Sequence, residues 1–247
     1  MAAREANGGD GGAGTAEPAV DVKGLRVTIQ GSLVLQGVDL TVPRGGVTAL
    51  LGRNGVGKTT TLRALIGLQT GTGDVRILGH ATRGWPVHKI IRLGIGYVPE
   101  DRDVFAKLTV AENLRIAQTA QTTAENYDRV YALFPELKAR HRQLAGTLSG
   151  GQQQMLAIGR VLLTERALLL VDEPTKGLSP KFVSEVVDAL ERVRDTVTIL
   201  IVEQNVHVVR RLAQHVVVLD HGTVAHTGDA SELEDENLVR RLLGVAR

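Results

Sequence analysis

The chain contains no cysteine among its 247 residues, and aromatic residues make up only 3% of it. The absence of cysteine excludes disulfides, thiolate nucleophiles and cysteine-ligated metals, and it suits a reducing compartment. Lys and Arg (29) nearly balance Asp and Glu (27), so a net charge of +2 gives no basic field that would argue for nucleic acid as a partner. Hydrophobic residues reach 43%, which predicts a folded chain with a substantial core, and the balanced charge predicts no nucleic-acid partner.

Long apolar segments are missing as well. No apolar run approaches the roughly 18 to 20 residues that a helix needs to cross a bilayer. The N-terminus lacks the apolar segment of a signal peptide, and residues 1–17 are rich in glycine, so we interpret them as a disordered tail. We therefore expect a soluble chain, or one attached to a membrane only through a partner.

The most informative motif is GRNGVGKT, at Gly52–Thr59. It fits the pattern G-x-x-x-x-G-K-[ST] and lies between Val47–Leu51, typical of a buried strand, and Thr60–Ile66, with helical spacing of apolar residues. Such a loop and the helix N-terminus after it form an anion site. Lys58 is predicted to reach the β- and γ-phosphates of a nucleotide, and the Thr59 hydroxyl to bind Mg²⁺. The residues predicted to bind ATP here are Gly52, Arg53, Asn54, Gly55, Val56, Gly57, Lys58, Thr59 and Thr60.

A second motif joins an apolar strand to two acidic residues. Leu168–Val171 is followed directly by Asp172 and Glu173, and Pro174 ends the strand. A carboxylate at the tip of a buried strand beside a phosphate loop can hold Mg²⁺, directly or through water. We predict this role for Asp172, and we predict that Glu173 orients the water that attacks the γ-phosphate. The alternative is an ordinary strand that ends in a solvated acidic turn.

A third motif, LSGGQQQ, occupies Leu148–Gln154 and precedes a helical pattern. Ser149, Gly150 and Gly151 would form a second anion-binding helix N-terminus. One nucleotide does not need two such loops from one chain. We therefore predict that the loop from Ser149 to Gln152 caps the γ-phosphate bound to another subunit, whereas the alternative is a glycine-rich helix cap.

The pattern of strands and helices predicts an α/β fold. Continuous apolar strands alternate with helices after residue 149, which favours a mostly parallel sheet covered by helices on both faces. Residues 101–148 are polar and helical, with Thr109 and Glu112 in a capping-box pattern. We predict a single domain over residues 18–247, with a core at about 18–100 and 149–247 and a helical subdomain at about 101–148.

With these motifs in this order, the chain resembles the ATP-binding subunits of ABC transporters from about Val20 to the C-terminus. The resemblance implies a phosphate-loop NTPase with a RecA-like core and an N-terminal antiparallel β subdomain. It implies an ATPase that uses ATP and Mg²⁺, with Glu173, Gln204 and Lys58 as catalytic residues. It also implies a head-to-tail dimer in which two ATP molecules lie between the phosphate loop of one subunit and the LSGGQ loop of the other.

Within this family the chain is most similar to the LivF subunits of branched-chain amino acid importers, and the subunits of urea importers are similar too. The resemblance implies two membrane permease subunits, a second ATPase subunit and an extracytoplasmic solute-binding protein, with the chain at the cytoplasmic face of the cell membrane. Residues 101–113 would contact a permease, unless they form a solvated loop. The segments that carry the resemblance are Tyr97–Glu100, Leu108–Leu114, Gly177–Pro180 and Val202–Asn205.

Several positions depart from the general pattern of the family, including Gly177–Pro180, which lacks the usual aspartate. Glu100 stands where most members have a glutamine that contacts Mg²⁺, but a carboxylate can still bind the metal or its water shell. Gln204 stands where most have a histidine, and an amide can hydrogen-bond phosphate without titrating near neutral pH. Ile29 occupies the position expected to stack an aromatic ring on adenine, so we expect apolar packing on the base and modest discrimination of ATP from GTP.

Two other functions are alternatives to an importer ATPase: an ABC ATPase that acts on a macromolecule, and an unrelated phosphate-loop enzyme such as a kinase.

Overall fold

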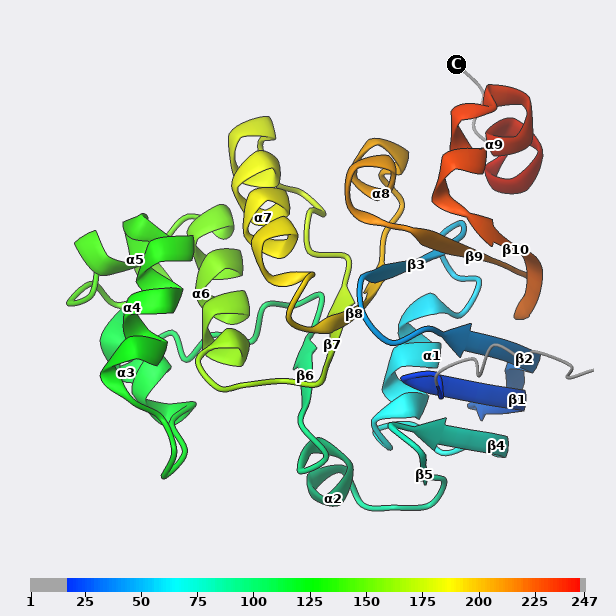
Figure 1. Ribbon diagram of the computed structural model, residues 1–247, viewed down its shortest axis with the longest axis horizontal. Helices are drawn as coiled ribbons and strands as arrows, with labels where there is room; N and C mark the ends of the chain where they lie inside the picture. The colour runs from blue at the N-terminus through cyan, green and yellow to red at the C-terminus, as the bar shows by residue number, and fades with distance from the viewer. Residues whose placement is uncertain (1–16, 245–247) are drawn as a thin grey trace, which may run out of the picture.

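The computed structural model describes residues 17–244, so the tail predicted for residues 1–17 lies outside the described residues except for Glu17. The chain forms two sheets with helices around them (Figure 1). One sheet has the strand order β2-β1-β4-β5 and the other β10-β9-β3-β8-β7-β6. These layers confirm the predicted α/β class with an N-terminal antiparallel β subdomain.

The four-stranded sheet is antiparallel: β1 pairs with β2 and with β4, and β4 pairs with β5. Its first turn, Gln30–Gly31, has left-handed φ angles of 49° and 81°, the conformation that two-residue hairpins require. Residues that alternate along the strands are buried on one face. The strands are β1 (Val20–Ile29), β2 (Ser32–Val42), β4 (Thr72–Ile77) and β5 (His80–Ala81).

The six-stranded sheet is parallel except at one edge, where β10 pairs antiparallel with β9. Every residue of β3, β7 and β8 is buried, because both faces of this sheet are covered, and this explains their almost uninterrupted apolar sequences. The strands are β3 (Val47–Leu51), β6 (Ile95–Val98), β7 (Leu168–Asp172), β8 (Thr198–Val202), β9 (His215–Asp220) and β10 (Thr223–Asp229).

Successive residues of these strands pack into two hydrophobic cores. Leu170 and Leu200 face the core shared with the antiparallel sheet and α1, whereas their neighbours Val171 and Ile201 face the core shared with the later helices. The sheet thus anchors both layers and holds the ends of its strands in fixed positions. The helices of the two layers are α1 (Lys58–Leu65), α2 (Val87–Ile91), α6 (Gly150–Leu162), α7 (Pro180–Val193), α8 (Val206–Leu212), η2 (Ala230–Glu234) and α9 (Glu236–Leu243).

Residues 101–148 contain α3 (Val110–Ile116), α4 (Ala124–Leu133), α5 (Pro135–Ala139) and the short turn η1 (Ala145–Thr147). They lie beside α6 at one end of the molecule (Figure 1). The predicted capping box at the start of α3 is confirmed: the Thr109 hydroxyl accepts from the Glu112 N–H, and the Glu112 carboxylate accepts from the Thr109 N–H at 2.8 Å. The residues just before it are not helical, and two of them, Arg102 and Asp103, have left-handed φ angles.

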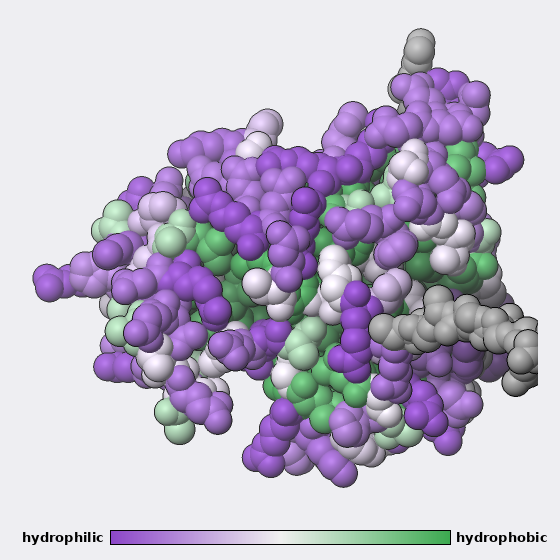
Figure 2. All heavy atoms as spheres, in the orientation of Figure 1, coloured by the Kyte–Doolittle hydropathy of each residue, from purple (hydrophilic) through white to green (hydrophobic). Residues whose placement is uncertain are grey.

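The surface seen in Figure 2 is mostly hydrophilic, and hydrophobic residues show chiefly between the helical end of the molecule and the two sheets. None of the helices in residues 17–244 combines the length and the apolar character needed to span a bilayer.

Candidate functional site

The carboxyl ends of four parallel strands meet at one edge of the second sheet. β3 leads into the phosphate loop, β8 leads to Gln204, β7 ends at Asp172 and β6 leads to Glu100. The strand order β3-β8-β7-β6 places these four ends next to one another. This is the edge at which open α/β sheets bind their ligands.

Glycines give the phosphate loop its shape. Gly57, which precedes α1, has a φ angle of 107°, and a Cβ there would lie 2.5 Å from a methyl group of Leu35. Gly52 has a φ angle of 150°, and its Cβ would collide with the carbonyl oxygen of Leu219. Only glycine fits both places, and turns of this kind direct backbone N–H groups toward an anion.

Lys58 is buried across the loop, with 4% of its surface exposed. Its Nζ donates to the carbonyl oxygens of Gly52 and Arg53, both at 2.9 Å, and lies 3.6 Å from Oε1 of Glu173. Burial lowers the pKa of Lys58, while Glu173 and Asp172 partly oppose this shift. A buried cation with a single close carboxylate gains from an additional anion, and a phosphate would supply one.

Asp172 is fully buried at the end of β7. The Thr59 hydroxyl donates to its Oδ1 at 3.0 Å, and the Tyr97 hydroxyl donates to its Oδ2 at 3.4 Å. Burial raises the pKa of Asp172 to about 6 and the pKa of Tyr97 to about 12. A carboxylate with this penalty on its charge gains from a nearby cation.

The oxygens of Thr59 and Asp172 suit a hard cation such as Mg²⁺. Residues 17–244 contain no group of three or more His, Cys, Asp or Glu side chains that could hold a metal by themselves. Mg²⁺ is usually bound by one or two carboxylates together with water and substrate phosphates, so the residues present fit this ion when a nucleotide is bound.

Glu173 follows Asp172 with a φ angle of 45°, a strained conformation for a residue other than glycine. It is buried, and its Oε1 accepts from Nε2 of Gln204 at 2.6 Å. The same Gln204 nitrogen donates to Oδ1 of Asn54, in the phosphate loop, also at 2.6 Å. The structure thus brings together Glu173, Gln204 and Lys58, the three residues that we predict to be catalytic.

A cavity of about 330 Å³ lies among these groups, bordered by the phosphate loop, Val34, Glu100, Glu173 and Lys176. Val34 also borders a neighbouring hollow of about 410 Å³ on the other side of the loop. Ile29 borders neither: it is half-buried at the end of β1, where it pairs with Ser32. Val34 is therefore an apolar group that borders both hollows, and contact of Ile29 with the base stays a prediction.

The LSGGQ loop starts α6 and has no contact with this cavity. Ser149 caps the helix: its hydroxyl accepts from the Gln152 N–H at 3.4 Å, and the Gln152 side chain accepts from the Ser149 N–H at 3.0 Å. Gly151 packs on the ring of Phe182, where any Cβ would collide. The residues from Ser149 to Gln152 do not border the cavity of their own chain.

Two side chains at the site were not predicted. Lys176 Nζ lies 2.5 Å from Oε1 of Glu100 and 3.3 Å from Oε2 of Glu173. Glu203 is buried and accepts hydrogen bonds from Thr175, through its N–H and its hydroxyl, and from the N–H groups of the next two residues. Burial raises the pKa of Glu203. Its place at the end of β8, directly before Gln204, was the available signal, whereas Lys176 had only its closeness to Glu173 in the sequence.

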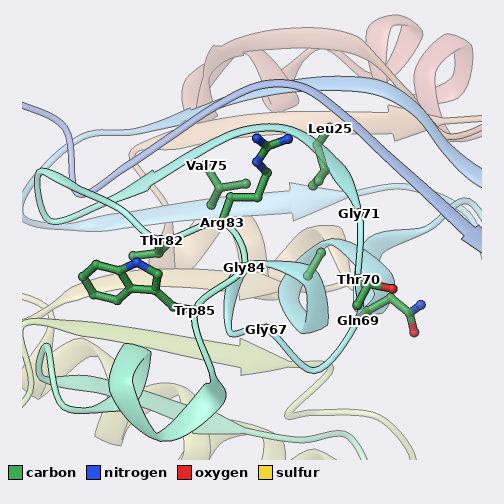
Figure 3. A pocket seen from close by; sticks show the side chains of 11 residues that line it. Leu25, Gly67, Gln69, Thr70, Gly71, Val75, Thr82, Arg83, Gly84 and Trp85 are labelled. Carbon is green, nitrogen blue, oxygen red and sulfur yellow. The ribbon is translucent and has the colours of Figure 1, made fainter.

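Another cavity, of about 450 Å³, lies between the end of α1 and the segment Thr82–Trp85 (Figure 3). It contains none of the predicted site residues. The site is therefore identified by its charged groups and by the strand ends, not by the volume of a cavity.

A profile of the ABC transporter family matches residues 35–176, a span that includes the phosphate loop, the LSGGQ loop and the Asp172–Glu173 pair. The chain belongs to the ABC transporter family. ATP-binding subunits of this family hydrolyse ATP, so the protein is an ATPase that binds the nucleotide, and such subunits act with membrane permeases.

The relatives of this ABC ATPase cover nearly its whole length. It is 41% identical over 219 residues to the probable branched-chain amino acid transport ATP-binding protein LivF of Archaeoglobus fulgidus. The alignment covers 86% of this chain and 93% of the relative. It is also 41% identical over 217 residues to the high-affinity branched-chain amino acid transport ATP-binding protein BraG of Pseudomonas aeruginosa, which covers 85% and 93%. The structure of cbiO1 from Clostridium perfringens, part of the ABC transporter complex cbiONQ, superposes with a TM-score of 0.76 at 27% identity and covers 91% of this chain and 94% of the other. The predicted resemblance to this family is confirmed.

Proposed function

We propose that this ABC ATPase powers an importer of branched-chain or related amino acids. The observation that carries the proposal is the 41% identity, over about 85% of the chain, to two relatives named as branched-chain amino acid transport ATP-binding proteins. The charged cavity at the strand ends supports the ATPase part of the proposal, because it offers a cation and hydrogen-bond donors to phosphate and oxygen ligands to Mg²⁺.

In this proposal the residues of the cavity have separate roles. The backbone of residues 52–60 and the Lys58 ammonium bind the phosphates. Thr59 and Asp172 hold Mg²⁺, with Glu100 on the ion or its water shell, and the ion neutralises charge on the phosphate oxygens. Glu173 accepts a hydrogen bond from the attacking water and orients it.

Gln204 is the residue that orients Glu173 in this scheme. Its amide already holds Glu173 at 2.6 Å and contacts the phosphate loop through Asn54. An amide has no proton to lose or gain near neutral pH, so we expect it to position the carboxylate and the γ-phosphate without acting as an acid or base.

We infer that the loop from Ser149 to Gln152 completes the site of a second ATPase subunit in a head-to-tail pair. Its location away from the cavity of its own chain supports this, as does the positive end of the 13-residue helix α6 that it begins. Two membrane permease subunits and an extracytoplasmic solute-binding protein complete the proposed assembly, at the cytoplasmic face of the cell membrane.

Mild crosslinking of native membranes, followed by purification of the chain, tests the assembly. We expect two permeases, a second ATPase and a solute-binding protein to be recovered together. Titration of that binding protein with leucine and, as the comparison, with urea then tests the substrate: tighter binding of leucine supports the proposal. Recovery of ribosomes or DNA without membrane proteins would contradict it.

A further inference from the structure

We propose that Lys176 is a positioning residue of the nucleotide cavity: it is the counter-charge that offsets the carboxylate of Glu100 and holds it together with Glu173 before ATP binds. This inference rests on the proposed binding of nucleotide in the cavity. It gives a role to a residue that no motif of the sequence marks.

The geometry places Lys176 between two carboxylates from different strands. Glu100 follows β6 and Glu173 follows β7, and these strands are parallel neighbours. Lys176 lies in the turn after β7, where its N–H donates to the Glu173 carbonyl at 3.2 Å. This turn brings Nζ to 2.5 Å from Glu100 and 3.3 Å from Glu173, and all three side chains border the same cavity.

The charges around the cavity explain why such a bridge matters. The carboxylates of Glu100 and Glu173 border the cavity with the ammonium groups of Lys58 and Lys176, and the carboxylate of Asp172 is bonded to Thr59, which also borders it. Without Lys176, Lys58 would be the remaining lysine on the border of the cavity, and ATP brings several more negative charges. Negative charges that share a partly buried site repel one another strongly, so the loss of Lys176 weakens binding of the phosphates.

Lys58 cannot take over this task. It is buried, and two backbone carbonyls of the loop hold its Nζ. Lys176 is half-exposed at the mouth of the cavity, and its Nζ lies within ion-pair distance of both carboxylates. An ion pair as exposed as this one contributes little to folding, and a purely structural role therefore predicts no change in nucleotide affinity when it is removed.

The test is the dissociation constant for ATP in the presence of EDTA, measured by calorimetry on the full chain. We expect Lys176→Met to weaken binding about tenfold, because one cation near the phosphates is lost. Lys176→Arg should bind like the wild type. The double variant Glu100→Gln/Lys176→Met has the charge of the wild-type cavity and should return to within about threefold of wild-type affinity. Lys23→Met, at an exposed lysine on β1 that pairs with Asp21 at 3.8 Å, is the matched control for the loss of one positive charge.

Two results would overturn the role of Lys176: wild-type affinity in Lys176→Met, or a double variant as weak as Lys176→Met alone. The proposed function fails separately, and visibly, if the wild-type chain itself binds no ATP with or without Mg²⁺. Far-ultraviolet circular dichroism and the urea midpoint of each variant establish that it is folded. We expect both to match the wild type, because the Lys176 side chain is half-exposed.

Discussion

The phosphate loop and the LSGGQ loop both place glycines at the start of a helix, but the protein builds them in different ways. Gly57 enters α1 with a left-handed φ angle and no capping side chain, and side chains from three strand ends, the carboxylates of Glu100 and Glu173 and the amide of Gln204, lie around the loop. Ser149 enters α6 through a local capping box, with neighbouring residues as its partners. The loop proposed to bind phosphate within its own chain is in contact with Gln204, 150 residues away from Asn54, whereas the cap of the loop proposed to act on another subunit forms between residues three positions apart.

The largest expected effect is a loss of ATP affinity when the phosphate loop, but not the LSGGQ loop, is changed. Lys58→Ala removes the buried ammonium, so we expect ATP affinity to fall by about a hundredfold or more. Calorimetric titration with Mg-ATP measures it, and Lys23→Ala, at an exposed lysine, is the control. Unchanged affinity in Lys58→Ala would remove the phosphate-loop assignment.

At the nucleotide cavity, Glu173→Gln is expected to slow ATP hydrolysis while leaving ATP binding nearly unchanged. The variant retains the hydrogen-bonding shape but cannot polarise water as a carboxylate does, so hydrolysis should fall about a hundredfold while ATP affinity stays within about threefold of the wild type. Phosphate release measures turnover, and gel filtration with ATP should reveal a trapped dimer. Glu165→Gln, at an exposed carboxylate before β7, is the control, and normal turnover in Glu173→Gln would show that another residue orients the water.

At the second loop we expect the opposite pattern. Gly150→Asp places a carboxylate at the start of α6, where it would repel the phosphate of a partner subunit. ATP affinity of the isolated chain should stay within about twofold of the wild type, while hydrolysis falls about tenfold or more. The nearest group to the new Cβ is the flexible guanidinium of Arg102, so the variant can fold. A loss of affinity as large as that of Lys58→Ala would mean that both loops serve the same chain's nucleotide.

The smallest expected effect is on protein stability, and it comes from Glu203, the buried carboxylate beside Gln204. The two Glu203 oxygens accept four hydrogen bonds, and an amide offers one acceptor oxygen, so Glu203→Gln should lower the free energy of unfolding by about 1–3 kcal/mol in urea titrations.

The stability of the wild type should also depend on pH through Glu203. Because burial raises the pKa of Glu203, the native state holds the carboxyl proton more tightly than the unfolded chain does. Its contribution to stability is therefore fully present below the ordinary value of 4.5 and declines as the pH rises through the folded pKa. The variant should lose this slope, and a slope identical to that of the wild type would contradict the assignment.

The sequence predicts the local features well, because they depend on neighbouring residues. The strand Val47–Leu51 has the predicted bounds, and the capping box at Thr109 forms as expected. The hairpin turn between β1 and β2 could not be predicted, since Gln30–Gly31 lacks the Asn-Gly or Asp-Gly signal of such turns.

Contacts between distant segments escaped prediction for a physical reason. Glu100 and Lys176 meet because β6 and β7 are neighbours in the sheet, which no local pattern specifies. The contact of Gln204 with Asn54 likewise requires β8 to lie beside β3. Motifs identified which residues reach the edge of the sheet, but the order of the strands determines which of them touch.

The most direct test of the central claim mixes two defective chains, Lys58→Ala and Gly150→Asp, under conditions in which the wild-type chain hydrolyses ATP. Each mixed pair contains one intact phosphate loop facing one intact LSGGQ loop. If the two loops act from different subunits, hydrolysis should recover to roughly a quarter of the wild-type rate, because half of the pairs are mixed and each holds one complete site. If the mixture is as inactive as either variant alone, the two loops do not complete each other across subunits and the account is wrong.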